Sequence, residues 1–286
     1  MLTRNDCGRG ARFLNSKPVS ANTSPGMVPM PMSPMRRYCS GAGTVCSALR
    51  MASTRFPGKP LTPLLGRPMI QWVVEAAEQA ALGADVVVAT PDVEIAEVAR
   101  DFGAEVEMTS IDHPSGTDRI AEVASRRVAD LYVNVQGDEP LIDPRTIAAC
   151  AAPLLVNDRV EMSSCWVSLD ADHAGDPSMV KVVLAENGEA LYFSRSPIPH
   201  PRDAAHAVYR KHLGIYAYRR ETLARFATWP TTALERAEGL EQLRFLEHGV
   251  RIRMAHGFES GLAVDLPEHA AQVEALLRER SEISPA

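Results

Sequence analysis

Over most of the chain, short apolar runs alternate with segments of helical periodicity. Residues 85–90 form a β-branched run that is typical of a buried parallel strand. On the same grounds we expect further strands at residues 106–108 and 131–135, and helices at residues 68–83, 92–103 and 117–129. This alternation predicts an α/β fold with a mostly parallel, doubly wound sheet. Ligands of such sheets bind beyond the carboxyl ends of the strands.

A different pattern occupies roughly residues 176–218. Two strand-like runs flank Asn187 and Gly188, residue types that tolerate the positive φ values of a tight hairpin turn. A third strand is expected over residues 211–218. The pattern predicts a small antiparallel insertion, after which apolar periodicity predicts a single helix over residues 234–248.

The first 43 residues differ in composition from the rest. These residues carry a net charge of +5. Because the whole chain carries −6, the remaining residues carry −11. Prolines at every second or third position of residues 27–35 prevent a helix there. We expect residues 1–43 to be a disordered or misassigned N-terminal extension, and residues 44–286 to form one domain that includes the insertion.

Composition excludes several classes of function. A net charge of −6 over 286 residues argues against a nucleic-acid-binding surface. Five irregularly spaced cysteines fit neither a disulfide framework nor a zinc site, so we expect a reducing, cytoplasmic location. No apolar stretch has the length of a membrane span, and no membrane insertion is expected.

A cationic loop follows the first apolar run. It contains Arg50, Ser53, Arg55 and Lys59, and glycine lies beside the lysine. Cations, a hydroxyl and a small residue suit a polyphosphate ligand, although the spacing is not that of a Walker loop. The spacing alone allows a solvated basic loop equally well.

Carboxylates occupy two positions where a metal site could form. Asp138 follows the predicted strand at residues 131–135 and lies close to Gln136, whereas Asp265 comes much later in the chain. Mg²⁺ at a nucleotide commonly takes one or two carboxylates together with phosphate oxygens. By spacing alone, Asp138 could instead start a turn and Asp265 could cap a helix.

Other polar residues lie at helix starts or within apolar elements. Ser115, Gly116 and Arg119 lie at an expected helix N-terminus, which suits ribose or base contacts. The remaining candidates are Arg195, His212, Tyr216, Glu241 and Gln242. Taken singly, each also fits a purely structural role in a strand or on a helix face. No nucleophile elbow or Ser/His/Asp signature is present, which disfavours a hydrolase.

Taken together and in order, these segments carry a resemblance. The motifs lie at residues 52–60, 115–122, 134–140, 180–183, 190–195, 211–216, 240–244 and 264–265. From about Arg50 to its C-terminus the chain resembles the 3-deoxy-manno-octulosonate (KDO) cytidylyltransferases, or CMP-KDO synthetases. The resemblance implies a nucleotide-diphospho-sugar-transferase-like fold and a homodimer formed partly through the insertion. It also implies that CTP and KDO react to give CMP-KDO and pyrophosphate, for lipopolysaccharide biosynthesis in the cytoplasm.

The resemblance further implies roles for individual residues. Nucleotide binding is implied for Arg50, Ser53, Arg55, Lys59, Ser115, Gly116, Arg119 and Asp138. Sugar binding is implied for Gln136, Arg195, His212, Tyr216, Glu241 and Gln242. The implied catalytic residues are Arg50, Lys59, Asp138 and Asp265, of which Asp138 and Asp265 hold Mg²⁺.

One segment departs from the family pattern. The first strand of the family usually ends in Pro-Ala-Arg, whereas Ala48 and Leu49 precede Arg50 here and Ser47 interrupts the apolar run. Two alternatives therefore stay open beside the leading interpretation. One is a cytidylyltransferase for a related sugar acid such as 8-amino-KDO, and the other is a catalytically impaired paralogue that binds nucleotide.

Overall fold

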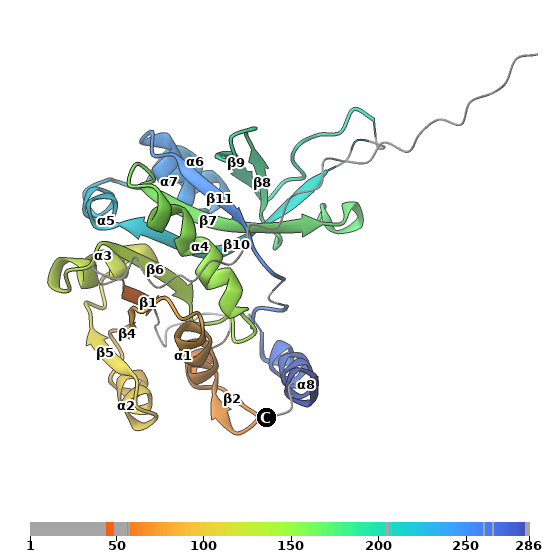
Figure 1. Cartoon of the computed structure of the whole chain (residues 1–286). Helices are drawn as coiled ribbons and strands as arrows, with labels where there is room; N and C mark the ends of the chain where they lie inside the picture. Colours follow the sequence, from red (N-terminus) through yellow and green to blue (C-terminus); the bar gives the residue numbers. More distant parts are fainter. Residues whose placement is uncertain are drawn as a thin grey trace, which may run out of the picture. The chain divides into compact units, whose positions relative to one another are not determined.

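A mixed sheet organises the fold (Figure 1). The computed structural model describes residues 44–48, 56, 58–203, 206, 208–259, 261–264 and 266–283, all within one compact unit of the chain, residues 38–286. The expected extension over residues 1–43 lies outside the described residues. So do the predicted site residues Arg50, Ser53, Arg55 and Asp265.

Within the described part, the sheet has nine strands. Seven follow the order β11-β7-β10-β6-β1-β4-β5, and β8 and β9 extend from β10. Their bounds are β1 (Thr44–Ala48), β4 (Asp85–Thr90), β5 (Glu105–Met108), β6 (Leu131–Gln136), β7 (Met162–Leu169), β8 (Lys181–Leu184), β9 (Ala190–Ser194), β10 (Tyr209–Arg219) and β11 (Ile252–His256). A small separate hairpin is formed by β2 (Pro63–Leu64) and β3 (Arg67–Pro68). The predicted α/β class and the parallel half of the sheet are confirmed, since β6, β1, β4 and β5 are parallel neighbours.

The first strand forms despite its unusual sequence. β1 lies between β4 and β6 and is paired with both along its whole length. Ser47, which interrupts the apolar run, takes its place in register with Val88 on one side and Val135 on the other. The backbone of residues 44–48 therefore keeps the position that a doubly wound sheet requires.

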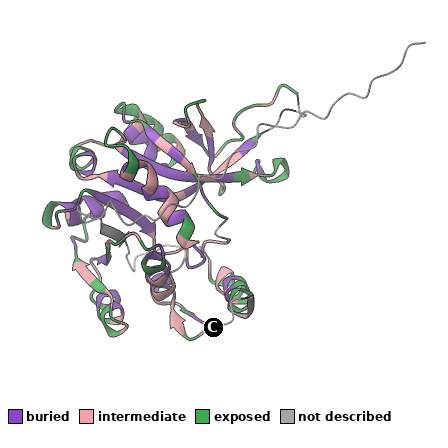
Figure 2. Ribbon diagram, in the orientation of Figure 1, coloured by how far each residue is buried: buried purple, intermediate pink, exposed green. Residues whose placement is uncertain are grey.

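Helices cover both faces of the sheet (Figure 1). They are α1 (Met69–Gln79), α2 (Val93–Asp101), α3 (Gly116–Arg126), α4 (Pro144–Val156), α5 (Arg220–Phe226), α6 (Ala233–Glu238), α7 (Gln242–Glu247) and α8 (Pro267–Ile283), with short 3-10 turns η1 (Lys59–Leu61) and η2 (Ala171–His173). α1, α2 and α4 pack with Val133 and Val135 on one face. α3, α5 and α7 pack with Tyr132 and Tyr218 on the other. Because successive strand residues point to opposite faces, β6 is buried on both sides (Figure 2).

The antiparallel insertion is only partly separate from the main sheet. β8 and β9 form the predicted hairpin, and Gly188 in its turn has a φ of 80°. The third predicted strand extends to residues 209–219 as β10 and lies antiparallel between β6 and β7. The insertion is therefore anchored in the centre of the sheet by its last strand.

The single helix expected over residues 234–248 is wrong. The structure has two short helices there, α6 and α7, because Gly239 adopts a left-handed φ of 63° that ends the first. Arg244 and Glu235 join the two helices through a buried ion pair, with Nε donating to Oε2 at 2.7 Å. After the break, Glu241 precedes α7, and Gln242, the first residue of α7, accepts from the Tyr216 hydroxyl on β10.

Candidate active site

The carboxyl end of β6 brings two of the predicted site segments together. β6 ends at Gln136, and a turn in which the Glu139 amide donates to the Gln136 carbonyl presents Asp138. Gly58, with a φ of 72°, precedes η1 and its first residue Lys59. The Lys59 ammonium donates to Asp138 Oδ2 at 2.6 Å. Lys59, the described cation of the cationic loop, and the carboxylate of Asp138 that the sequence singled out therefore meet at one point.

A later loop of the chain also reaches this point. The backbone amide of Val264 donates to the Asp138 carbonyl at 2.9 Å. In the sequence, Val264 immediately precedes Asp265. The structure thus brings the chain on the N-terminal side of the second candidate carboxylate to the first.

The donor chemistry at Asp138 fits Mg²⁺. Within the described residues, no group of three or more His, Cys, Asp or Glu is arranged to hold a metal ion. Mg²⁺ does not require such a group, because it keeps several waters and takes one or two carboxylates together with phosphate oxygens. The Asp138 side chain retains 35% of its exposure, so its oxygens can reach such a ligand.

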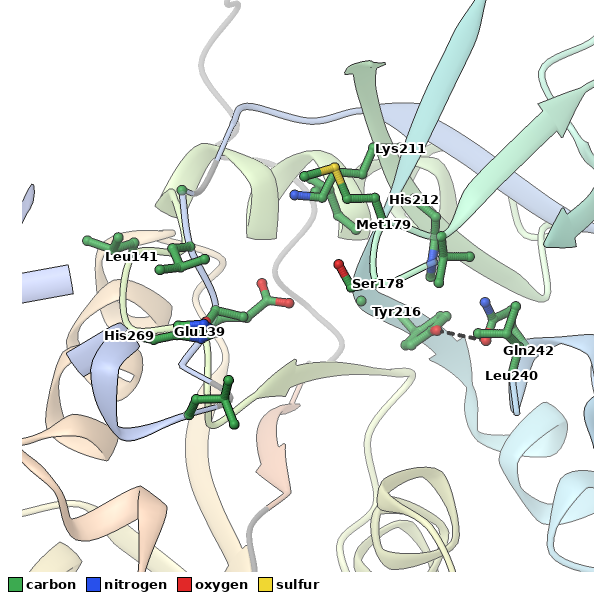
Figure 3. A pocket seen from close by; sticks show the side chains of 17 residues that line it. Glu139, Leu141, Ser178, Met179, Lys211, His212, Tyr216, Leu240, Gln242 and His269 are labelled. Carbon is green, nitrogen blue, oxygen red and sulfur yellow. Dashed lines mark hydrogen bonds between the residues drawn. The ribbon is translucent and has the colours of Figure 1, made fainter. Parts of the chain in front are cut away.

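A cavity of about 470 Å³ lies beside this turn. Its lining includes three of the predicted sugar-binding residues, His212, Tyr216 and Gln242. Figure 3 shows Tyr216 and Gln242 meeting on one side of the cavity, where the Tyr216 hydroxyl donates to Gln242 Oε1 at 3.1 Å. Glu139 and His269 lie on the opposite side. Acceptors and donors on facing walls suit a ligand with many hydroxyl groups.

His212 is held as a neutral ring. Burial lowers the pKa of His212 to about 3. The Ser164 hydroxyl lies 2.9 Å from His212 Nε2 and donates its proton to the Ile215 carbonyl at 2.7 Å. Ser164 must therefore accept from Nε2, which leaves Nδ1 of His212 as an acceptor.

Burial also governs the ionisation of Tyr216 and Glu241. Burial raises the pKa of Tyr216 well above its usual range, so the hydroxyl stays protonated and can donate. Burial likewise raises the pKa of the Glu241 carboxyl, and hydrogen bonds with Thr117 and Ser115 oppose this rise. Glu241 thus lies near the start of α3, where Ser115 and Gly116 were predicted to bind nucleotide.

The residues predicted to bind nucleotide at the start of α3 cap the helix or hold the loop before it. Ser115 caps α3 and accepts from the Asp118 amide at 3.2 Å, and Gly116 is the first residue of the helix. Arg119 is buried, and its guanidinium donates to Thr109 and to the Ser110 carbonyl. Arg119 therefore holds the loop that precedes the cap.

Gln136 lies next to the cavity, whereas Arg195 is not part of its lining. The Gln136 side chain is a neighbour of Gly214, which lines the cavity. The Arg195 guanidinium donates to three backbone carbonyls, those of Glu238 at 2.8 Å, Pro177 at 2.9 Å and Gly239 at 3.4 Å. The Arg195 guanidinium thus contacts the chain itself in the described structure, and the sugar binding that the resemblance implies for it stays a prediction.

The sequence reasoning missed several lining residues. Ser178 and Met179 come from the loop before β8, and Lys211 precedes the predicted His212. Gly214 carried a usable signal, since a glycine inside a strand often marks a close approach. A Cβ at Gly214 would lie 3.4 Å from Glu139 Oε1.

No helix in the described part of the chain combines the length and the apolar character needed to cross a bilayer.

Comparisons with known proteins agree with this geometry. The chain matches the Cytidylyltransferase family over residues 48–252. It is 50% identical over 240 residues to the 3-deoxy-manno-octulosonate cytidylyltransferase of Syntrophotalea carbinolica, covering 80% of this chain and 96% of the relative. The Escherichia coli enzyme of the same name is 44% identical over 228 residues, with 80% and 93% covered.

Solved structures point the same way. A CMP:2-keto-3-deoxy-manno-octonic acid synthetase complexed with CTP superposes with a TM-score of 0.82 at 42% identity, covering 84% of this chain and 99% of the other. A cytidylyltransferase from Leptospira borgpetersenii, at 17% identity and a TM-score of 0.56, shares the fold. The chain belongs to the 3-deoxy-manno-octulosonate cytidylyltransferase family.

Proposed function

We propose that this protein transfers the cytidylyl group of CTP to KDO, giving CMP-KDO and pyrophosphate. The observation that carries this function is the contact between Lys59 and Asp138 at the end of β6, beside a cavity with polar walls. Relatives that are 44% to 50% identical bear the name of this activity. The reaction activates the sugar acid for lipopolysaccharide biosynthesis.

The chemistry is a single displacement at phosphorus. The anomeric hydroxyl oxygen of KDO forms a bond to the α-phosphorus of CTP, and the bond from that phosphorus to the β-phosphate bridging oxygen breaks. Pyrophosphate leaves with the bonding electrons, and the hydroxyl proton is released. Little covalent work falls to the protein, so positioning and charge neutralisation account for the catalysis.

The residues at the end of β6 serve the phosphates. The Lys59 ammonium already lies at the carboxylate of Asp138 and neutralises charge on the leaving pyrophosphate. Arg50, Ser53 and Arg55 complete the triphosphate-binding loop. Asp138 and Asp265 hold Mg²⁺, which when bound neutralises phosphate charge and polarises the α-phosphate. The bond between Val264 and the Asp138 carbonyl supports this pairing of carboxylates.

The start of α3 and the cavity serve the two organic groups. Ser115 and Gly116 contact the cytidine, and Arg119 acts by fixing the loop before them. Gln136, His212, Tyr216, Glu241 and Gln242 bind hydroxyl groups of KDO. Because Ser115 and Thr117 lie close enough to Glu241 to lower the pKa of its carboxyl, the sugar and nucleotide sites adjoin each other.

We also place the protein in the cytoplasm as a homodimer. The family resemblance implies both. In support of the dimer, the insertion exposes two large apolar side chains, Leu191 at 60% and Val208 at 54%. A second copy packed on the insertion would cover them.

The deciding test is pyrophosphate release measured with CTP, a panel of sugar acids and Mg²⁺. We expect release with KDO, and none when CTP, KDO or Mg²⁺ is omitted. A higher kcat/KM with 8-amino-KDO than with KDO would identify 8-amino-KDO as the preferred substrate. Binding of CTP without release of pyrophosphate at high enzyme concentration would instead identify a nucleotide-binding paralogue.

A further inference from the structure

Lys211 is a cation in the lining of the cavity beside β6, and it has no role in the reaction as proposed so far. Lys211 lines this cavity from β10, next to Ser178 and Met179. Its ammonium makes no hydrogen bond or ion pair with any residue in the described part of the chain. In Figure 3 the Lys211 side chain extends past Met179, with its nitrogen toward the side on which Glu139 lies.

Three other cations of the described part of the chain are engaged by the protein itself. Lys59 is bound to Asp138. Lys181 is fully buried, and its ammonium donates to the carbonyls of Asp176 at 2.8 Å and Arg195 at 2.5 Å. The Arg195 guanidinium donates to the carbonyls of Pro177 and Glu238. Among the described lining residues, Lys211 is therefore the permanent cation that is available to a ligand.

Lys211 is also firmly placed. It pairs with Val167 on β7 and with Lys181 on β8, and the amide of the next residue, His212, donates to the Val180 carbonyl at 2.8 Å. Functional groups on paired strands are positioned more accurately than groups on free loops. The same strand carries His212 and Tyr216, which also line the cavity.

These observations match the two chemical features of a sugar acid. Neutral donors and acceptors at His212, Tyr216 and Gln242 suit its hydroxyl groups, and a cation is needed for its carboxylate. We propose that Lys211 receives the carboxylate of the sugar acid and thereby selects acids over neutral sugars. The inference rests on the proposed function. Arg195 is then a positioning residue that ties the loop before β8 to the chain before α7.

The test is steady-state kinetics of Lys211→Met and Lys211→Arg. Methionine keeps the length of the side chain and removes its charge. Loss of a charge-assisted contact costs about 10- to 100-fold in affinity, so we expect Lys211→Met to raise the KM for KDO by that factor. The kcat and the KM for CTP should change little, and Lys211→Arg should recover most of the affinity. Arg251→Met, an exposed cation outside the cavity, is the matched control.

A second measurement separates a carboxylate contact from a structural effect. The carboxamide of KDO should bind the wild-type enzyme weakly, and Lys211→Met should weaken its binding no further. An equal loss for acid and amide, or a wild-type KM for KDO in Lys211→Met, would overturn the assignment of Lys211. If the wild-type enzyme released no pyrophosphate with any sugar acid, the proposed function itself would fail.

Discussion

The ammonium of Lys59 and the carboxylate of Asp138 lie 2.6 Å apart across 79 residues of sequence. The contact holds Lys59 against the turn that follows β6, and the Lys59 side chain is only 11% exposed. A buried lysine so close to a carboxylate is held in place before any ligand arrives. For the proposed reaction, this cation is therefore already positioned for the leaving group when a triphosphate binds, and little ordering remains to be done.

Asp138→Asn should therefore remove turnover while it preserves the shape of the site. The amide keeps the size of the side chain but loses the charge that holds Lys59 and that, in the proposed site, would hold Mg²⁺. We expect kcat/KM to fall by about 10²- to 10³-fold, the usual cost of losing one preorganised electrostatic contact. The Mg²⁺ concentration for half-maximal activity should rise as well.

Asp143→Asn is the matched control for this variant. Asp143 lies in the same loop, caps α4 and pairs with the exposed Arg145. Loss of the Asp143 carboxylate should lower the free energy of unfolding by about 1 kcal/mol or less, and kcat should stay unchanged. Wild-type turnover by Asp138→Asn at the same Mg²⁺ concentration would remove Asp138 from the proposed metal site.

The elements that could be predicted from sequence are those with a strong local pattern. The apolar run at β4 and the Asn187–Gly188 turn are fixed by neighbouring residues alone, and the structure confirms both. The position of β10 between β6 and β7 depends on pairing over long sequence separations, which a local pattern does not reveal. Gly239 was visible in the sequence, but whether a glycine ends a helix depends on the packing around it.

The same distinction holds for the site. Lys59 and Asp138 could be singled out because unusual residue types follow an apolar run, and the end of β6 brings them together. The surroundings of Arg195 could not be predicted in this way. Its guanidinium binds the carbonyls of Pro177 and Glu238, groups that every residue carries and that leave no trace in the sequence.

The neutral state of His212 predicts a pH dependence of stability. Its pKa falls from 6.5 to about 3 on folding, so between these values the unfolded chain binds a proton that the native state excludes. This contribution to stability is complete above pH 6.5 and is lost as the pH falls. The slope from one such group is at most about 1.4 kcal/mol per pH unit.

His212→Gln should flatten that slope. Urea unfolding at several pH values between 7.5 and 4.5 measures it. His206→Gln is the control, because the His206 side chain is 84% exposed and its removal should leave the slope as in the wild type. An unchanged slope in His212→Gln would show that His212 is charged in the native state.

Glu241→Gln should raise stability and lower activity. Burial raises the pKa of the Glu241 carboxyl, so this group favours folding only at low pH, and that contribution is lost as the pH rises through the folded pKa. At pH 7.5 the wild type bears the cost of a buried carboxylate that glutamine avoids. We expect a higher melting temperature and a KM for KDO raised about 10-fold, since a charged acceptor is lost.

Glu221→Gln, an exposed substitution on α5, is the control for Glu241. It should change neither property, because a solvated carboxylate has little effect on folding. A lower melting temperature for Glu241→Gln would mean that the contacts with Ser115 and Thr117 outweigh the cost of burial.

Gly261→Ala should disturb the loop that leads to the second carboxylate. Gly261 has a φ of 85°, and a Cβ there would lie 2.9 Å from Leu141 Cδ1, a side chain of the cavity wall. Either Leu141 or the chain toward Val264 must move, and Val264 is bound to Asp138. We expect kcat to fall about 10-fold, because small displacements of a reacting group are costly. Gly66→Ala, at a φ of 79° with open space around it, isolates the backbone cost of about 1 kcal/mol. Equal losses of stability and equal kcat values in the two variants would mean that the contact with Leu141 does not position the site.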